Sequence, residues 1–188
     1  MINNLPKSLS EINLQKWIDW DIKPKKYSLD YFENEYNYYL NRYCFFSNLS
    51  IEDLDLENEE LIKDIIKETS INQLNLLSEL NDLSYSLYEE IFFGKQVLVI
   101  KKINFGDVVG LKTFEETNRL ALILADFQDG NSMTLLELCM SYLVDKTGQK
   151  ILSFESAKRL PLSIAMKVKK YIEDTIIIYN SEKQINFD

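Results

Sequence analysis

The acidic residues of this chain are the first candidates for chemistry, because two segments place them near a glycine as a calcium-binding loop does. An EF-hand loop needs oxygen ligands at positions one, three, five and nine, glycine at six and glutamate at twelve. In a frame that starts at Asp145, glycine falls at position four and Ser156 at twelve. We therefore interpret residues 145–155, DKTGQKILSFE, as a tight turn followed by a short extended segment.

A second frame runs from Asp126 to Glu137 and does place acids at positions one and twelve. It puts Gly130 at position five, where a ligand belongs, and Asn131 at position six, where glycine belongs. This segment therefore favours a turn between two helices over a metal site.

Other residues that could act as catalysts lack their usual partners. The chain has no histidine, which removes the commonest general base, the commonest zinc ligand and every Ser-His or Cys-His pair. Glu115 with Glu116, and Asp126 with Asp129, have the residue types for acid–base catalysis, but solvation at the surface explains them more simply. The motifs GxxxxGK[ST], GxGxxG, GxSxG and CxxC do not occur. We expect no catalytic residue, no metal and no cofactor, and hence no enzyme.

The composition is that of a folded protein rich in helices. Of 188 residues, 46% are hydrophobic, whereas only 5 are glycine and 3 are proline, which favours long helices over many-stranded sheets. Cys44 and Cys139 lie far apart among apolar neighbours, so we interpret them as reduced core residues of a cytoplasmic protein. No apolar run approaches the roughly 18 residues that span a bilayer, so we expect no membrane contact.

The net charge of −9 is concentrated in the N-terminal half. Residues 1–94 contain 8 basic and 18 acidic residues, whereas residues 95–188 contain 13 and 12. Phosphate backbones repel an acidic surface, so nucleic acid is not expected as a partner, and the lysines near 158–170 are interpreted as a solvated helix face. The change at Gly94 separates an acidic helical region, 1–94, from a neutral region, 95–188. The alternative is that both belong to one compact domain.

The spacing of apolar residues predicts a bundle of about seven short helices. The first helix should begin near Ser10, after Ser8 and Glu11 with capping-box spacing, and end before Pro24. Other helices are predicted from Ser28, over 58–68, from Ser70 or Asn72, over 114–127 with 120–125 the most buried, from Ser132, over 154–160 and from Pro161 onward.

Two stretches depart from the helical pattern. KQVLVIKKI, residues 95–103, is rich in β-branched residues and flanked by glycines, which predicts a strand around 96–103. The extended segment after the turn at Asp145 predicts a second strand around 150–154. The predicted fold class is therefore mainly α, with one or two short strands.

A leucine seam on the helix after Ser70 has two interpretations. Leu76, Leu80, Leu83 and Leu87 are spaced four, three and four residues apart, as in a coiled coil. Barely two heptads are present, so we favour packing within the chain over a partner helix.

Some large aromatic residues do not all fit on the predicted core stripes, which makes them candidates for contact with a partner. The alternative is that both tryptophans pack against the second helix. The candidate residues are Trp17, Trp20, Tyr31, Tyr38 and Phe45.

Three stretches resemble small proteins that assemble tailed bacteriophages. LPKSLSEINLQKWIDW (5–20), followed by the acidic LSIEDLDLENEELIKDI (49–65), is similar to the arrangement in phage tail assembly chaperones. INFGDVVGLKTFEE (103–116) is similar to an amphipathic linker of small phage proteins. LVDKTGQKILSFESAKRLPLSIAMKVKKYIEDTI (143–176) resembles the C-terminal end of tail assembly chaperones. The resemblance implies a non-enzymatic protein of the host cytoplasm that holds tape-measure, hub or ring subunits before the tail assembles.

Two other classes of function stay open. One is a structural subunit of the neck, tail hub or baseplate that remains in the virion. The other, disfavoured by the missing ligand spacing, is an enzyme that uses carboxylates and a divalent metal. The sequence predicts neither the partner's identity nor the oligomeric state.

Overall fold

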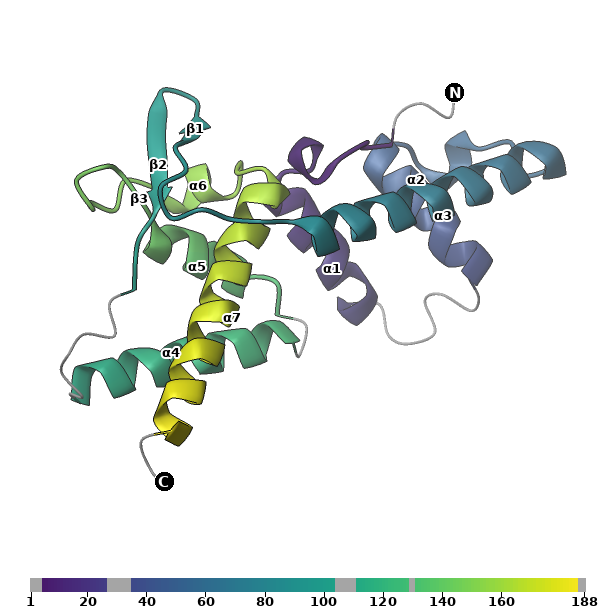
Figure 1. Cartoon of the computed structure of the whole chain (residues 1–188). Coiled ribbons are helices and arrows are strands. Elements are labelled where there is room, and N and C mark those ends of the chain that lie inside the picture. Colours follow the sequence, from purple (N-terminus) through teal and green to yellow (C-terminus); the bar gives the residue numbers. More distant parts are fainter. Residues whose placement is uncertain (1–4, 27–34, 104–110, 129–130, 186–188) are drawn as a thin grey trace.

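The computed structural model describes residues 5–26, 35–103, 111–128 and 131–185, and these residues are mainly helical (Figure 1). The predicted class, helical with a few short strands, is confirmed. The helices are α1 (Leu14–Lys26), α2 (Glu35–Ser47), α3 (Glu59–Asp82), α4 (Leu111–Gln128), α5 (Thr134–Tyr142), α6 (Phe154–Ala157) and α7 (Leu162–Ile185), with 3-10 turns η2 (Leu9–Glu11) and η4 (Ile51–Asp53).

A small antiparallel sheet has the strand order β1-β2-β3. β1 (Ile91–Phe93) and β2 (Gln96–Ile100) form a hairpin, and β3 (Leu143–Val144) pairs with the end of β2. The strand predicted around 96–103 is therefore present, but the one predicted around 150–154 is wrong. Leu143 and Val144 pair instead, because they leave α5 beside β2 and are both buried there.

The start of α1 differs from the prediction, because Asn13 caps this helix. The side-chain oxygen of Asn13 accepts a hydrogen bond from the backbone N–H of Lys16 at 2.7 Å. Glu11 instead accepts from the backbone N–H of Lys7 at 2.8 Å, within the preceding turn. The helix also continues past Pro24 to Lys26, since a proline in the last turn removes only one helical hydrogen bond.

The two helices predicted over 58–68 and from Ser70 are one continuous helix, α3. It begins where the first of them was predicted, and Asn58 caps it, accepting from the backbone N–H of Leu61 at 3.1 Å. The hydroxyl of Ser70 donates to the carbonyl oxygen of Lys67 at 2.8 Å, and that of Thr69 donates to Ile65 at 2.7 Å. Both hydroxyls bond back along α3, so neither begins a new helix.

The helices of the C-terminal half differ from the prediction in detail. Ser132 does not cap α5, because its hydroxyl has no hydrogen-bond partner among the described residues. The most buried helix is α5 rather than the 114–127 segment, where Leu122 is 68% exposed. α6 ends at Ala157, earlier than predicted, whereas α7 begins directly after Pro161, as predicted. The cap predicted at Ser28 lies outside the described residues.

One apolar core joins both halves of the chain. It combines Ile12, Leu14 and Ile18 with residues of α5 and α7 such as Leu135 and Val168. Leu76 belongs to the same core, and Leu80, Leu83 and Leu87 pack against it, so the leucine seam packs within the chain. A smaller cluster between α2 and α3 consists of Leu40, Tyr43, Cys44, Ile62 and Ile65.

Backbone hydrogen bonds join the N-terminal segment to the linker between α6 and α7. The N–H of Leu14 donates to the carbonyl of Leu160 at 2.8 Å, and the N–H of Leu162 donates to Ile12 at 2.7 Å. The N–H of Gln15 donates to a third carbonyl of the linker at 2.9 Å. We call this contact, residues 12–15 with residues 158–162, the junction.

Residues 83–90 connect α3 to β1 and are fastened to α7. The carbonyl of Leu83 accepts a hydrogen bond from Lys170. The ring of Tyr85 packs edge-on against Tyr171, with the ring centroids 5.4 Å apart. Glu89 accepts from the ammonium of Lys167 at 2.6 Å. Among the described residues, no helix is both long and apolar enough to cross a membrane.

Replacing Leu14 with alanine should destabilise the whole fold, because Leu14 is fully buried in the shared core. We expect a loss of about 2–5 kcal/mol in the free energy of unfolding by urea. Leu122→Ala, at a 68% exposed site, is the matched control and should change it by less than about 0.5 kcal/mol. A transition that splits, with only part of the helical signal moving, would contradict a single core.

Alkaline pH should weaken the attachment of residues 83–90 through Tyr85. Burial, a hydrogen bond to Asp174 and the charge of Asp174 raise the pKa of Tyr85 from 10.0 to about 12. The folded state therefore holds the proton of the Tyr85 hydroxyl more tightly than the unfolded state does. The stability that this difference contributes is lost as the pH rises from about 10 to about 12. Urea denaturation across this pH range should show a smaller decrease in the free energy of unfolding for Tyr85→Phe than for the wild type. Tyr88→Phe, which removes an exposed hydroxyl from the same segment, should behave as the wild type.

Candidate partner-binding site

The short helix α6 separates two grooves on the surface. The first, the apolar groove, has a volume of about 360 Å³ and is lined by Met133, Leu136, Glu137, Met140, Ser141, Lys150, Leu152 and Phe154. The second, the polar groove, has a volume of about 500 Å³ and is lined by Asn13, Gln15, Lys16, Asp19, Glu155, Lys158 and Arg159.

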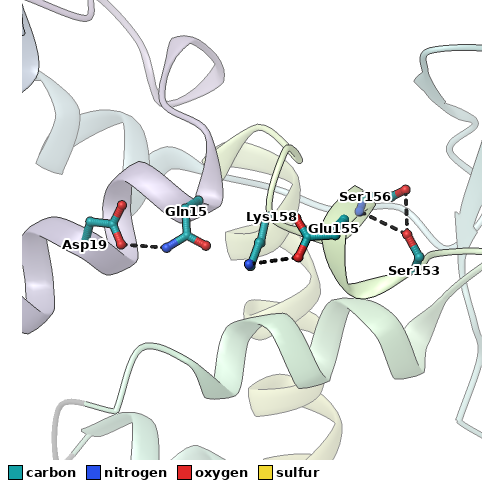
Figure 2. Close-up of polar contacts among 6 residues, drawn as sticks. All are labelled: Gln15, Asp19, Ser153, Glu155, Ser156 and Lys158. Atoms are coloured by element: carbon teal, nitrogen blue, oxygen red, sulfur yellow. Dashed lines mark hydrogen bonds and ion pairs between the residues drawn. The ribbon is translucent and has the colours of Figure 1, made fainter.

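Local hydrogen bonds hold α6 in place between these grooves. The hydroxyl of Ser153 accepts from the backbone N–H of Ser156 at 3.2 Å and lies 2.9 Å from its hydroxyl (Figure 2). The ammonium of Lys158 lies 3.0 Å from a carboxylate oxygen of Glu155 and 4.4 Å from the ring centroid of Phe154. Lys158 thus restrains one residue of each groove, through an ion pair and a cation–π contact.

The apolar groove has a rigid floor and an exposed rim. Leu136 and Leu152 form the floor and are buried, with 1% and 7% of their surface exposed. Met133 and Phe154 belong to the lining but are 38% and 41% exposed. Methionine is flexible and polarisable, so Met133 and Met140 can adjust to apolar groups of different shape.

The two charged residues of the apolar groove differ in their partners. Glu137 is paired with Arg119, whose guanidinium lies 2.9 Å from the carboxylate. Lys150 is exposed and forms no hydrogen bond or ion pair with the described residues. The groove therefore combines apolar side chains that solvent can reach with one cation that forms no ion pair with the described residues.

The polar groove satisfies most of its polar groups internally. Gln15 donates to the carboxylate of Asp19 at 2.6 Å, and Gln15 faces Lys158 across the groove (Figure 2). The ammonium of Lys16 donates to the carbonyl of Phe46 at 3.1 Å and to Asn48 at 2.9 Å, and burial lowers the pKa of Lys16.

The N-terminus of α1 in the polar groove has no vacant N–H for an anion. The first backbone N–H groups of this helix already donate to the junction carbonyls and to Asn13. Among the residues that line this groove, only Gln15 has a buried side-chain atom, its amide oxygen, without a hydrogen-bond partner in the described chain. The polar groove is therefore a weaker candidate for a binding site than the apolar groove.

The structure brings three of the aromatic residues that sequence analysis predicted as partner contacts into one internal cluster. Trp20 is 5% exposed, and its ring centroid lies 5.8 Å from that of Tyr38 and 5.4 Å from that of Phe45. Trp17 is partly buried, and its indole N–H has no partner among the described residues. Tyr31 lies outside the described residues. A partner could reach Trp20 only if the cluster opened, and partner binding by these five residues stays a prediction.

A buried arginine completes this aromatic cluster. Arg42 is 4% exposed, and its guanidinium lies 4.9 Å from the ring centroid of Phe46 and 5.7 Å from that of Trp20. Burial lowers the pKa of Arg42, whereas Tyr38 raises it through its charge and a hydrogen bond. The rings supply part of the electrostatic stabilisation that water would give an exposed guanidinium.

The residues considered first for chemistry have structural surroundings. Asp145 accepts hydrogen bonds from Thr147, both backbone at 2.8 Å and hydroxyl at 2.7 Å, and from the N–H of Gln149 at 2.9 Å. These bonds lower the pKa of Asp145, with the Thr147 hydroxyl contributing most. Gly148 has a φ of +84°, which completes the predicted tight turn.

Neither the cysteines nor the acids of the described chain form an evident reactive group. Cys44 and Cys139 are both buried, as predicted for core residues, and burial raises the pKa of Cys139 to about 12. Glu115 and Asp126 are exposed at the surface, whereas Asp129 lies outside the described residues. In the part of the chain that is described, no three His, Cys, Asp or Glu side chains gather as metal ligands would.

Sequence analysis did not identify the apolar groove. Its lining comes from α5 and from residues 150–154, which are separated by a turn, and apolar residues of a groove have the same spacing as core residues. A lysine followed by apolar residues in KILSF, residues 150–154, was the only local signal. Comparison of the chain with protein-family models, with curated proteins and with solved structures finds no match.

Replacing Trp20 with alanine tests whether the aromatic cluster is part of the core. We expect a loss of about 3–5 kcal/mol in the free energy of unfolding, because the buried indole packs against three aromatic rings. Tyr88→Ala, at an aromatic residue that is 87% exposed, is the control and should change stability by less than about 0.5 kcal/mol. Unchanged stability in Trp20→Ala would favour the contact role predicted from sequence.

Proposed function

We propose that this protein catalyses no reaction and acts by binding an amphipathic segment of a partner protein in the apolar groove. The observation that carries the proposal is the combination of exposed Met133 and Phe154 with the unpaired cation Lys150 in one concave site. The partner segment would place apolar side chains on the floor and a carboxylate near Lys150.

The size and composition of the groove support an occupant of this kind. A volume of about 360 Å³ has room for a few side chains of one helix or extended segment. Burying apolar surface yields about 25 cal/mol per Å² removed from water, and flexible methionines increase the range of side chains that fit. A carboxylate beside Lys150 would add specificity and association rate more than affinity.

The more specific proposal is that the protein is a phage tail assembly chaperone in the host cytoplasm. It rests on the resemblance of residues 5–20, 49–65, 103–116 and 143–176 to small phage morphogenesis proteins. The last of these stretches contributes Lys150, Leu152 and Phe154 to the apolar groove, so the resembling segment and the proposed site overlap. The occupant would then be a segment of a tape-measure, hub or ring subunit, held until the tail assembles.

A second candidate is a subunit that remains in the virion, in the neck, tail hub or baseplate. It is favoured by Tyr88 and Phe92, which are 87% and 74% exposed next to and on β1. β1 pairs only with β2 among the described residues, so its outer edge could pair with a strand of a neighbouring subunit.

Groove variants should lose the partner while the fold is kept. The experiment expresses tagged full-length protein together with the products of its neighbouring genes and identifies what co-purifies by mass spectrometry. Met133→Glu and Lys150→Glu should each weaken binding of the captured subunit by about tenfold, by burying a charge or by repelling the partner's carboxylate. Lys95→Glu makes the same change in net charge as Lys150→Glu, but in the hairpin turn, and should bind as the wild type.

Each result separates the proposals. A captured tail subunit that binds the wild type and both groove variants equally would show that the apolar groove is not the contact. Absence of the protein from purified particles agrees with a chaperone, whereas a fixed copy number in particles selects the structural subunit. Circular dichroism of each variant shows whether a loss of binding reflects a loss of folding.

A further inference from the structure

The outer face of α3 carries apolar side chains that no described element covers. The opposite face of this 24-residue helix buries Ile62, Ile65, Thr69 and Leu76. α2 packs against α3, and η2 contacts it, while the N-terminal part of α3 extends away from the C-terminal half of the molecule (Figure 1). We call Ile71, Leu74 and Leu77 the α3 stripe.

The α3 stripe is continuous and strongly exposed. Ile71 is 42%, Leu74 65% and Leu77 46% exposed. Residues three apart lie on neighbouring turns of a helix, so these side chains form one ridge rather than scattered contacts. Single exposed apolar residues are common on protein surfaces, but a contiguous group indicates an interaction surface.

Opposite charges lie at the two ends of the stripe. Lys67 precedes Ile71 by one turn, and Asp82 ends α3 beyond Leu77. Both charged side chains are exposed, and neither forms an ion pair with another described residue. Ser78 and Asn81, also exposed, lie between Leu74 and Asp82 on the same side. The stripe therefore has Lys67, beside the exposed Glu68, at one end, an apolar centre, and the negative Asp82 at the other end.

We propose that the α3 stripe binds the α3 stripe of a second copy of this chain, in an antiparallel pair about a twofold axis at Leu74. Such a pair places Ile71 opposite the second copy's Leu77, and Leu74 opposite Leu74. It also brings Lys67 next to the second copy's Asn81 and Asp82, and symmetry repeats this ion pair at the other end. A parallel pair would instead place Lys67 beside Lys67 and Asp82 beside Asp82, which is repulsive.

This surface is separate from the apolar groove. α5 and α6, which form the groove, lie at the opposite end of the molecule from the α2–α3 pair (Figure 1). A dimer through α3 therefore leaves both grooves open and presents two binding sites to a partner that has repeated segments. The self-association does not depend on what occupies the groove.

Sedimentation of the purified full-length chain, at concentrations up to several hundred micromolar, tests the proposal. We expect a monomer–dimer equilibrium, and Leu74→Glu should weaken it at least about tenfold, because each dimer would bury two new charges. Leu122→Glu is the matched control, since Leu122 is 68% exposed on α4 and lies outside the stripe, and it should dimerise as the wild type. A chain that is monomeric at every concentration would overturn the proposal, as would equal weakening by both variants.

A charge exchange tests the antiparallel arrangement itself. Lys67→Glu and Asp82→Lys should each weaken the dimer, because each puts like charges together at both ends. The double variant Lys67→Glu/Asp82→Lys should regain most of the wild-type affinity, and higher salt should reduce the differences. Failure of the double variant to recover would rule out this pairing. A monomeric chain that loses a captured protein on Leu74→Glu would assign the stripe to that protein instead.

Discussion

The contact on which the rest of the structure depends is the junction between residues 12–15 and 158–162. Leu14, Leu160 and Leu162 are fully buried there, and the N–H groups of Leu14 and Leu162 donate across it at 2.8 and 2.7 Å. A buried amide without a partner costs about 1–3 kcal/mol, so the junction has one favoured register. Because α1 and α7 both begin at this point, it fixes the direction of the N-terminal helices relative to the C-terminal half.

The junction also determines where the candidate site lies. The backbone bond from Gln15 to Lys158 places the end of α6 against α1, which closes the polar groove with side chains from both halves. One side of α6 faces the polar groove. Phe154 lines the apolar groove on the other side, where residues of α5 supply most of the remaining apolar lining. A helix as short as α6 has little stability of its own. Its position, and hence the shape of the apolar groove, follows from the junction and from the cap at Ser153.

The parts of the fold that sequence predicted are those decided by residues close together in the chain. The start of α3 near Asn58, the turn at Gly148 and the start of the last helix after Pro161 each depend on a few neighbours. The junction, β3 and the apolar groove bring together residues that are far apart in sequence, and no local pattern records such contacts. The sequence left open whether Trp20 packs against the second helix or contacts a partner, since an aromatic residue at helical spacing looks the same in both cases.

The helix break predicted near Ser70 was wrong, and the α3 stripe exists only because α3 is continuous. With a helix break near Ser70, Lys67 would lie on a different axis from Leu74 and Asp82, and no stripe would exist. The hydroxyls of Thr69 and Ser70 bond back to carbonyls of the preceding turn, so the helix continues and aligns these side chains along one face. The acidic excess of residues 1–94 would repel a second copy in most orientations. In the antiparallel pair of α3 stripes, Lys67 of one copy meets Asp82 of the other. The acidic excess therefore disfavours other orientations of the two copies and leaves this one favoured.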